Sequence, residues 1–103
     1  MLYKNFQGEK LSELGYGLMR LPVVDGNDAV IDEAEAEKLI DYAYSNGINY
    51  FDTAFPYHEG NSENVLFAAL KDYPRETYYI ADKFPGYDLS NMDKVEEIFA
   101  AQL

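Results

Sequence analysis

Strand-like and helix-like segments alternate along this chain, and that alternation restricts its fold more than any other feature. Short β-favouring runs are centred near Tyr16, Phe51 and Tyr79 of the 103 residues, and each leads on to a segment with apolar residues at helical spacing. Alternating strands and helices imply parallel strands joined by right-handed crossovers. The sequence therefore predicts an α/β fold with three strand–helix (βα) units.

Turn and capping residues bound these units. Gln7-Gly8-Glu9 separates two short strand-like runs, which predicts a hairpin before the first unit. Residues 22–28, with Pro, Gly, Asn and two Asp, are expected to form a loop. Asp32 stands at capping-box spacing from Glu35 and should begin the first helix, which Asn46-Gly47 should end.

Similar signals bound the other two helices. Asn61 or Ser62 is expected to cap the second helix, and Tyr73-Pro74-Arg75 is expected to end it. Ser90 is expected to open the third helix. The stripe predicted along that helix comprises Met92, Val95, Phe99 and Gln102.

Composition excludes several classes of protein. The chain has 8 Lys and Arg against 19 Asp and Glu, a net charge of −11, so it would repel the phosphate backbone of a nucleic acid. It has no Cys, which excludes a disulfide framework and a thiolate metal site. No apolar run approaches the roughly 18 residues of a membrane span, and no signal-peptide pattern begins the chain. We expect a soluble, cytoplasmic protein with no nucleic-acid or membrane partner.

Three βα units make an incomplete sheet. Parallel sheets need both faces covered, and the first and third strands would keep unpaired edges. A (β/α)8 or TIM barrel contains eight such units, typically in about 250 residues. We therefore expect residues 1–103 to form a single, incomplete domain: an N-terminal β-hairpin followed by three βα units of a TIM barrel.

Three polar residues lie where α/β folds place their functional side chains, at and after the carboxyl ends of strands. Asp52 ends the second strand, Tyr57 follows in the next loop, and Lys83 ends the third strand. An ammonium favours the charged form of a nearby phenol, and a carboxylate keeps that ammonium charged, so the trio would be a tuned general acid for a carbonyl oxygen. Spacing alone leaves a structural alternative, in which Asp52 anchors a loop and Lys83 is a solvated charge.

Asp52-Thr53-Ala54-Phe55-Pro56-Tyr57 resembles the Asp-x-Ala-x-x-Tyr signature of the aldo-keto reductases. Residues 47–51 resemble the second strand of that family, residues 60–66 the start of its second helix, and residues 80–83 its third strand with the Lys. Residues 14–20 resemble the first strand and the loop that lies near the nicotinamide. The resemblance covers nearly the whole chain, in the family's order.

The resemblance implies roles for these residues. Tyr57 would be the general acid, Lys83 the group that lowers its pKa, and Asp52 the partner of Lys83. The cofactor would be NADPH or NADH and the substrate a small aldehyde or ketone. The predicted nicotinamide-binding residues are Gly17, Leu18, Met19, Arg20 and Asp52. The walls assigned to the carbonyl pocket, from position only, are Tyr16, Phe55 and Phe84.

Two departures from the family pattern affect the expected activity. The family's fourth catalytic residue, a His on the fourth strand, has no counterpart here, and His58 is interpreted as a loop residue. Asp82 replaces a smaller residue and is expected to face the helices. Because the late strands that hold the rest of the cofactor have no counterpart in these 103 residues, we expect the chain alone to be inactive.

Two other functions remain open from the sequence. The chain could be a non-catalytic assembly module that pairs with a copy of itself or with a complementing fragment through its sheet edges. It could also be a metal-dependent barrel that uses Asp52, His58, Glu59 and Glu63. We disfavour the metal site because adjacent His58 and Glu59 give no chelating face on a regular helix.

Overall fold

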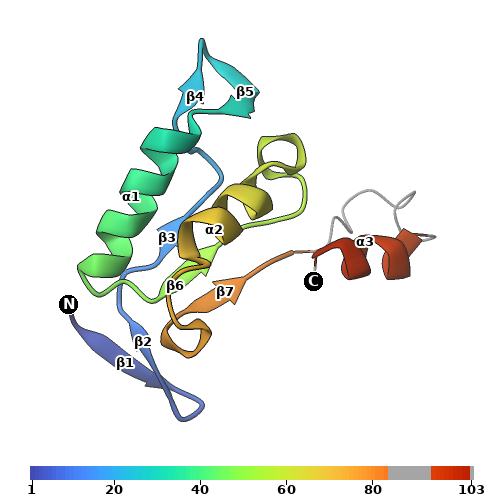
Figure 1. Cartoon of the computed structure of the whole chain (residues 1–103). Coiled ribbons are helices and arrows are strands. Elements are labelled where there is room, and N and C mark those ends of the chain that lie inside the picture. The colour runs from blue at the N-terminus through green and yellow to red at the C-terminus, as the bar shows by residue number, and fades with distance from the viewer. Residues whose placement is uncertain (84–93, 103) are drawn as a thin grey trace.

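The computed structural model describes residues 1–83 and 94–102, and its centre is a parallel sheet covered by two helices (Figure 1). The sheet has the strand order β3-β6-β7, in which β6 is the middle strand. The strands are β1 (Tyr3–Phe6), β2 (Glu9–Ser12), β3 (Tyr16–Gly17), β4 (Val23–Val24), β5 (Asn27–Ile31), β6 (Tyr50–Asp52) and β7 (Tyr79–Ala81). The helices are α1 (Glu33–Ser45), α2 (Ser62–Leu70) and α3 (Val95–Gln102), with short 3-10 turns at η1 (Tyr57–Gly60) and η2 (Arg75–Thr77).

The middle strand of the sheet carries the core. Phe51 of β6 is fully buried, and its ring lies 6.1 Å from that of Tyr16 on β3. The first two helices pack on each other and contribute Ile40 and Leu66 to the same cluster. Since side chains alternate along a strand, the burial of Phe51 turns its neighbour Asp52 to the other face of the sheet.

The predicted N-terminal hairpin is confirmed, and it is tied to the amino end of the sheet. β1 and β2 pair in antiparallel register around Gln7 and Gly8, which both have positive φ. The side chain of Asn49, just before β6, accepts from the Ser12 amide at 2.8 Å and donates to the Lys10 carbonyl at 2.9 Å. The hairpin therefore lies at the end of the sheet opposite to Asp52 (Figure 1).

The first helix follows the prediction closely. Asp32 is its N-cap, and its side chain accepts a hydrogen bond from the Glu35 amide. The helix ends at Asn46, and Gly47 continues with φ +98°. A Cβ on Gly47 would lie 2.8 Å from the hydroxyl of Tyr3, which donates to the Gly47 carbonyl. Glycine is thus required both by the backbone and by the hairpin that packs on it.

The loop predicted over residues 22–28 is wrong. Val23–Val24 and Asn27–Ile31 form an antiparallel ribbon, β4–β5, joined by Asp25-Gly26. Both turn residues have positive φ, 52° and 70°. Asp-Gly is a strong hairpin signal because both residues tolerate that conformation. The polar residues clustered in this stretch are also typical of a loop, which is why the sequence pattern favours the wrong structure.

The second and third helices differ from the prediction in detail. Asn61 occupies the N-cap position of α2, but its side chain makes no capping hydrogen bond to the helix. Its side-chain amide instead donates to the Ala29 carbonyl of β5 at 2.8 Å. In α3, Val95 and Phe99 of the predicted stripe are exposed, and Ile98 is the buried residue. The tertiary contact with β5 decides the role of Asn61. The predicted start of α3 at Ser90, the stripe residue Met92 and the pocket wall Phe84 lie outside the described residues.

Within residues 1–83 and 94–102, no helix combines the length and the apolar character that crossing a lipid bilayer requires.

Replacing Phe51 by Ala should destabilise the chain severely, because the ring is fully buried at the centre of the sheet. We expect a loss of about 3–5 kcal/mol in the free energy of unfolding, measured by urea denaturation. Phe67→Ala is the matched control, since that ring is 70% exposed on α2. Equal losses in the two variants would contradict the assignment of Phe51 to the core.

Candidate active site

The sheet register places two of the predicted functional residues on one face. Asp52 pairs with Ala81 across β6 and β7, and Lys83 follows Ala81 by two positions. Pairing continues past the strands, since the Thr53 amide donates to the Ala81 carbonyl at 2.8 Å and the Phe55 amide to the Lys83 carbonyl at 3.2 Å. Because residues two apart in an extended segment point the same way, Lys83 reaches back over Asp52.

The amino group of Lys83 is the centre of the site. Its Nζ forms an ion pair with Asp52 Oδ1, donates to the Thr53 carbonyl at 3.0 Å and donates to the Tyr57 hydroxyl at 3.3 Å. The same Nζ lies 5.1 Å from the centre of the Tyr57 ring. The three side chains predicted from the sequence thus converge at the carboxyl end of the sheet, and their catalytic roles stay predictions.

The surroundings of Lys83 keep its ammonium charged. Partial desolvation lowers its pKa, but the hydrogen bonds to Asp52 and Tyr57 and the charges of both groups outweigh it, so the pKa of Lys83 is raised. The side chains of Lys83 and Asp52 remain 49% and 40% exposed.

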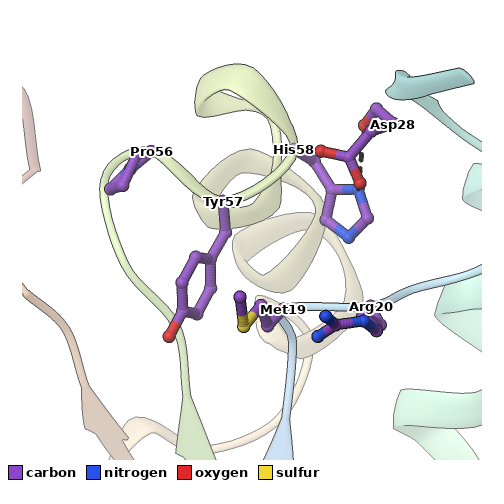
Figure 2. Close-up of a pocket in the computed structure, with 6 residues that line it drawn as sticks. All are labelled: Met19, Arg20, Asp28, Pro56, Tyr57 and His58. Atoms are coloured by element: carbon purple, nitrogen blue, oxygen red, sulfur yellow. Dashed lines mark hydrogen bonds and ion pairs between the residues drawn. The ribbon is translucent and has the colours of Figure 1, made fainter.

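A pocket of about 410 Å³ opens beside Tyr57 (Figure 2). In Figure 2 the Tyr57 ring descends from its turn toward Met19, while the His58 ring leaves the same turn toward Asp28. The residues that line the pocket are Met19, Arg20, Asp28, Pro56, Tyr57 and His58. A molecule in this pocket would lie against the Tyr57 side chain.

The five residues predicted to bind the cofactor have different positions in this region. Gly17 pairs with Asp52 across β3 and β6, so both lie at the rim of the site. Met19 is 53% exposed and lines the pocket with Arg20. Leu18 is fully buried in the core, so its side chain is not available to a ligand. Of the residues expected to form the walls of the carbonyl pocket, Tyr16 and Phe55 are half-buried.

Sequence reasoning missed the contribution of two residues to this site. His58, interpreted as a loop residue, does lie in a 3-10 turn, but its ring is fully buried and hydrogen-bonded at both nitrogens. Thr53 supplies the carbonyl that Lys83 binds, and its own hydroxyl shares a 2.8 Å hydrogen bond with buried Ser62. For His58, the only signal in the sequence is its position next to Tyr57.

Two further carboxyl groups, those of Glu63 and Asp82, lie near the Lys83 backbone. Glu63 of α2 accepts a hydrogen bond from Gln102 of α3 at 3.0 Å, and the same amide donates to the Lys83 carbonyl at 3.0 Å. Burial raises the pKa of Glu63 to about 7, with a hydrogen bond and negative charge from Asp82 adding to it and Gln102 opposing it. Asp82 therefore faces α2, as the sequence predicted, and it is exposed there.

The four residues of the metal-site alternative do not form a ligand cluster. Over the described part of the chain, no group of three or more His, Asp or Glu side chains lies within reach of one metal ion. His58 uses both ring nitrogens for backbone groups, and Asp52 is paired with Lys83. This arrangement removes the support for that alternative.

Comparisons with known proteins agree on one family. The model of the aldo/keto reductase family matches residues 13–101. Probable aldo-keto reductase 1 of Glycine max is 40% identical over 78 residues, which are 76% of this chain and 22% of the relative. Versiconal hemiacetal acetate reductase of Aspergillus parasiticus is 37% identical over 78 residues, 74% of this chain and 23% of the relative. The chain thus spans less than a quarter of either relative.

Solved structures show the same fold. An aldo-keto reductase from Bacillus halodurans, solved in its holo form, superposes with a TM-score of 0.62 at 35% sequence identity. The match covers 75% of this chain and 23% of that structure. The three βα units and the site between them are therefore part of a TIM-barrel architecture.

Replacing Glu63 by Gln should change how stability depends on pH. Its pKa in the folded chain, about 7, lies above the ordinary 4.5, so its contribution to stability is complete below pH 4.5 and is lost as the pH rises toward 7. The Gln variant should lack this slope and be more stable than the parent chain at pH 8. We expect a gain on the order of 1 kcal/mol, because solvent screens a partly exposed group.

Urea denaturation between pH 4.5 and 8 measures this effect. Glu37→Gln, on the exposed face of α1, is the control and should keep the parent pH profile. A Glu63→Gln variant that follows the parent profile would show that folding does not raise the pKa of Glu63.

Proposed function

Since this chain belongs to the aldo/keto reductase family, we propose that it forms the N-terminal part of a barrel that reduces aldehyde or ketone carbonyls with NADPH or NADH. The observation that carries the proposal is the convergence of Asp52, Tyr57 and Lys83 beside an open pocket. The substrate class is a small carbonyl compound. A cytoplasmic location stays a prediction from the sequence.

The proposed role of Tyr57 is to deliver a proton. The phenol would donate its proton to the carbonyl oxygen as the carbonyl carbon is reduced. The Lys83 ammonium, 3.3 Å from the phenol oxygen, would stabilise the phenolate that remains. Asp52 would hold Lys83 in place and keep it charged. Carbonyl reduction then leaves an alcohol, with one proton taken from Tyr57.

The residues beside Tyr57 fit the nicotinamide end of such a cofactor. Exposed Met19 offers apolar surface for a flat ring, and Arg20 offers positive charge for an anionic ligand. The cofactor would supply the hydride when bound. Because these residues contact one end of a dinucleotide only, we expect the 103 residues alone to bind it weakly and to be inactive.

We also propose that the sheet associates with further protein. Among the described strands, β3 and β7 each have one partner, so each has a free edge. Ile80 of β7 is 37% exposed, and Leu14 before β3 is 58% exposed. A complementing barrel segment would cover both edges, and a second copy of the chain is the alternative occupant.

The solution mass of the 103-residue chain shows whether it is a monomer or associates with further copies of itself. We expect the chain alone to self-associate at micromolar concentration, because the edges and apolar side chains are uncovered. Light scattering after size-exclusion chromatography measures it. A folded monomer at all concentrations would contradict self-association through these edges, and it would leave both the complementing-segment occupant and the reductase proposal unaffected.

Replacing Tyr57 by Phe tests the reductase proposal in the barrel protein that contains this segment. We expect carbonyl turnover to fall by at least roughly 100-fold, because the proton donor is lost, while cofactor affinity is retained. Oxidation of NADPH or NADH, followed by absorbance, measures turnover, and fluorescence titration measures the affinity.

The matched control removes a hydroxyl from a remote tyrosine. Tyr42 is 67% exposed on α1, and Tyr42→Phe should leave both turnover and affinity unchanged. If Tyr57→Phe turns over carbonyls at the parent rate, Tyr57 is not the acid and the proposal is wrong.

A further inference from the structure

The ring of His58 is held in one tautomer by two backbone groups. Its Nε2 accepts a hydrogen bond from the Leu21 amide at 2.9 Å, so Nε2 carries a lone pair. The ring hydrogen is therefore on Nδ1, which donates to the Asp28 carbonyl at 2.9 Å. The Asp28 carboxylate also lies 3.2 Å from Nδ1. The His58 side chain is fully buried, and both ring nitrogens are hydrogen-bonded.

These bonds join two segments of the pocket wall. Leu21 follows Met19 and Arg20 in the loop after β3, and Asp28 belongs to β5. His58 is the neighbour of Tyr57 in the turn after β6. Figure 2 shows the His58 ring beside Asp28 and the Tyr57 ring extending from the same turn farther from Asp28, with Met19 below both rings. The imidazole thus ties the Tyr57 backbone to the loop that faces the phenol.

The turn that carries both residues is strained. His58 and Glu59 both have left-handed φ values, 53° and 52°, which non-glycine residues rarely adopt. Two consecutive residues keep such a conformation only when surrounding contacts enforce it. The hydrogen bonds of the His58 ring are contacts of this kind, since Glu59 is exposed.

The contact between Tyr57 and Lys83 does not position the phenol by itself. The distance from Lys83 Nζ to the Tyr57 hydroxyl is 3.3 Å, a weak hydrogen bond, and the Lys83 side chain is 49% exposed. A flexible, half-exposed lysine restrains its partner poorly. The backbone of the turn must therefore set the direction of the Tyr57 side chain.

We infer that His58 is a positioning residue, whose two backbone hydrogen bonds fix the turn so that the Tyr57 phenol faces both Lys83 and the pocket. This inference rests on the proposed function, in which Tyr57 is the acid. His58 itself does not exchange protons with a substrate, because both nitrogens are bound to backbone groups. Its effect would be on the rate of proton delivery and not on substrate affinity.

Variants of His58 distinguish the effect of its buried ring volume from the effect of its two hydrogen bonds. His58→Phe keeps the ring and its burial but removes both bonds. His58→Gln keeps an acceptor that reaches the Leu21 amide, and His58→Asn keeps a donor that reaches only the Asp28 carbonyl. Glu59→Gln changes an exposed side chain in the same turn and is the control.

In the barrel protein we expect His58→Phe to lower kcat by roughly 10- to 100-fold, with KM for the carbonyl changed by less than about threefold, because misplacement of the acid affects the reaction step. His58→Gln should recover most of kcat, and His58→Asn less. Glu59→Gln should match the parent. If the Phe variant does not fold, the Gln and Asn variants decide the test, and parent kcat in both overturns the inference.

A measurement on the 103-residue chain is independent of activity. With 15N-labelled histidine, NMR should show the His58 ring hydrogen on Nδ1 and a lone pair on Nε2. The Tyr57 ring, whose centre lies 5.1 Å from Lys83 Nζ, should show cross-relaxation to the Lys83 side chain, which His58→Phe should weaken and Glu59→Gln should keep. Protonation at Nε2, or a Tyr57 ring unaffected by His58→Phe, overturns the inference.

The two proposals fail in different ways. Parent turnover in Tyr57→Phe rejects the acid and so the proposed function. Loss of turnover in Tyr57→Phe, together with parent kcat in folded His58→Phe, rejects only the positioning role of His58.

Discussion

Parallel pairing on both sides of β6 is the constraint on which the site depends. The register that aligns Gly17, Asp52 and Ala81 brings the ends of three strands to one level. Phe51, fully buried on the helix side, fixes which face each neighbouring residue takes. Asp52 must then point away from the helices, and Lys83, two positions beyond Ala81, points the same way. A slip of one residue would send both charges into the apolar core.

Tyr57 is held between two different kinds of interaction. On one side Lys83 supplies charge, through an amino group that also binds Asp52 and the Thr53 carbonyl. On the other side the buried His58 ring fixes the orientation of the turn through hydrogen bonds to the Leu21 amide and the Asp28 carbonyl. The Lys83 side chain is half-exposed to solvent, whereas the His58 side chain is buried.

Local signals predicted most elements of this fold, and they failed where a distant segment supplied the decisive contact. Asp32 caps α1 as expected, because an N-cap needs only neighbours along the chain. Asn61 has the same capping chemistry, yet its amide binds the Ala29 carbonyl of β5 instead. The buried side of α3 follows Ile98 and not the predicted stripe. The β4–β5 hairpin is an exception, because Asp25-Gly26 is a local turn signal.

By itself the sequence determined the order of strands and helices, the family signature, and the presence of Asp52, Tyr57 and Lys83 at strand ends. Periodicity and turn residues encode such features within a few positions. The tertiary structure alone decided that Lys83 binds a residue 31 positions away and that His58 accepts from an amide 37 positions away. Contacts over such separations depend on how strands pair and helices pack, and no local pattern specifies the direction of a buried ring.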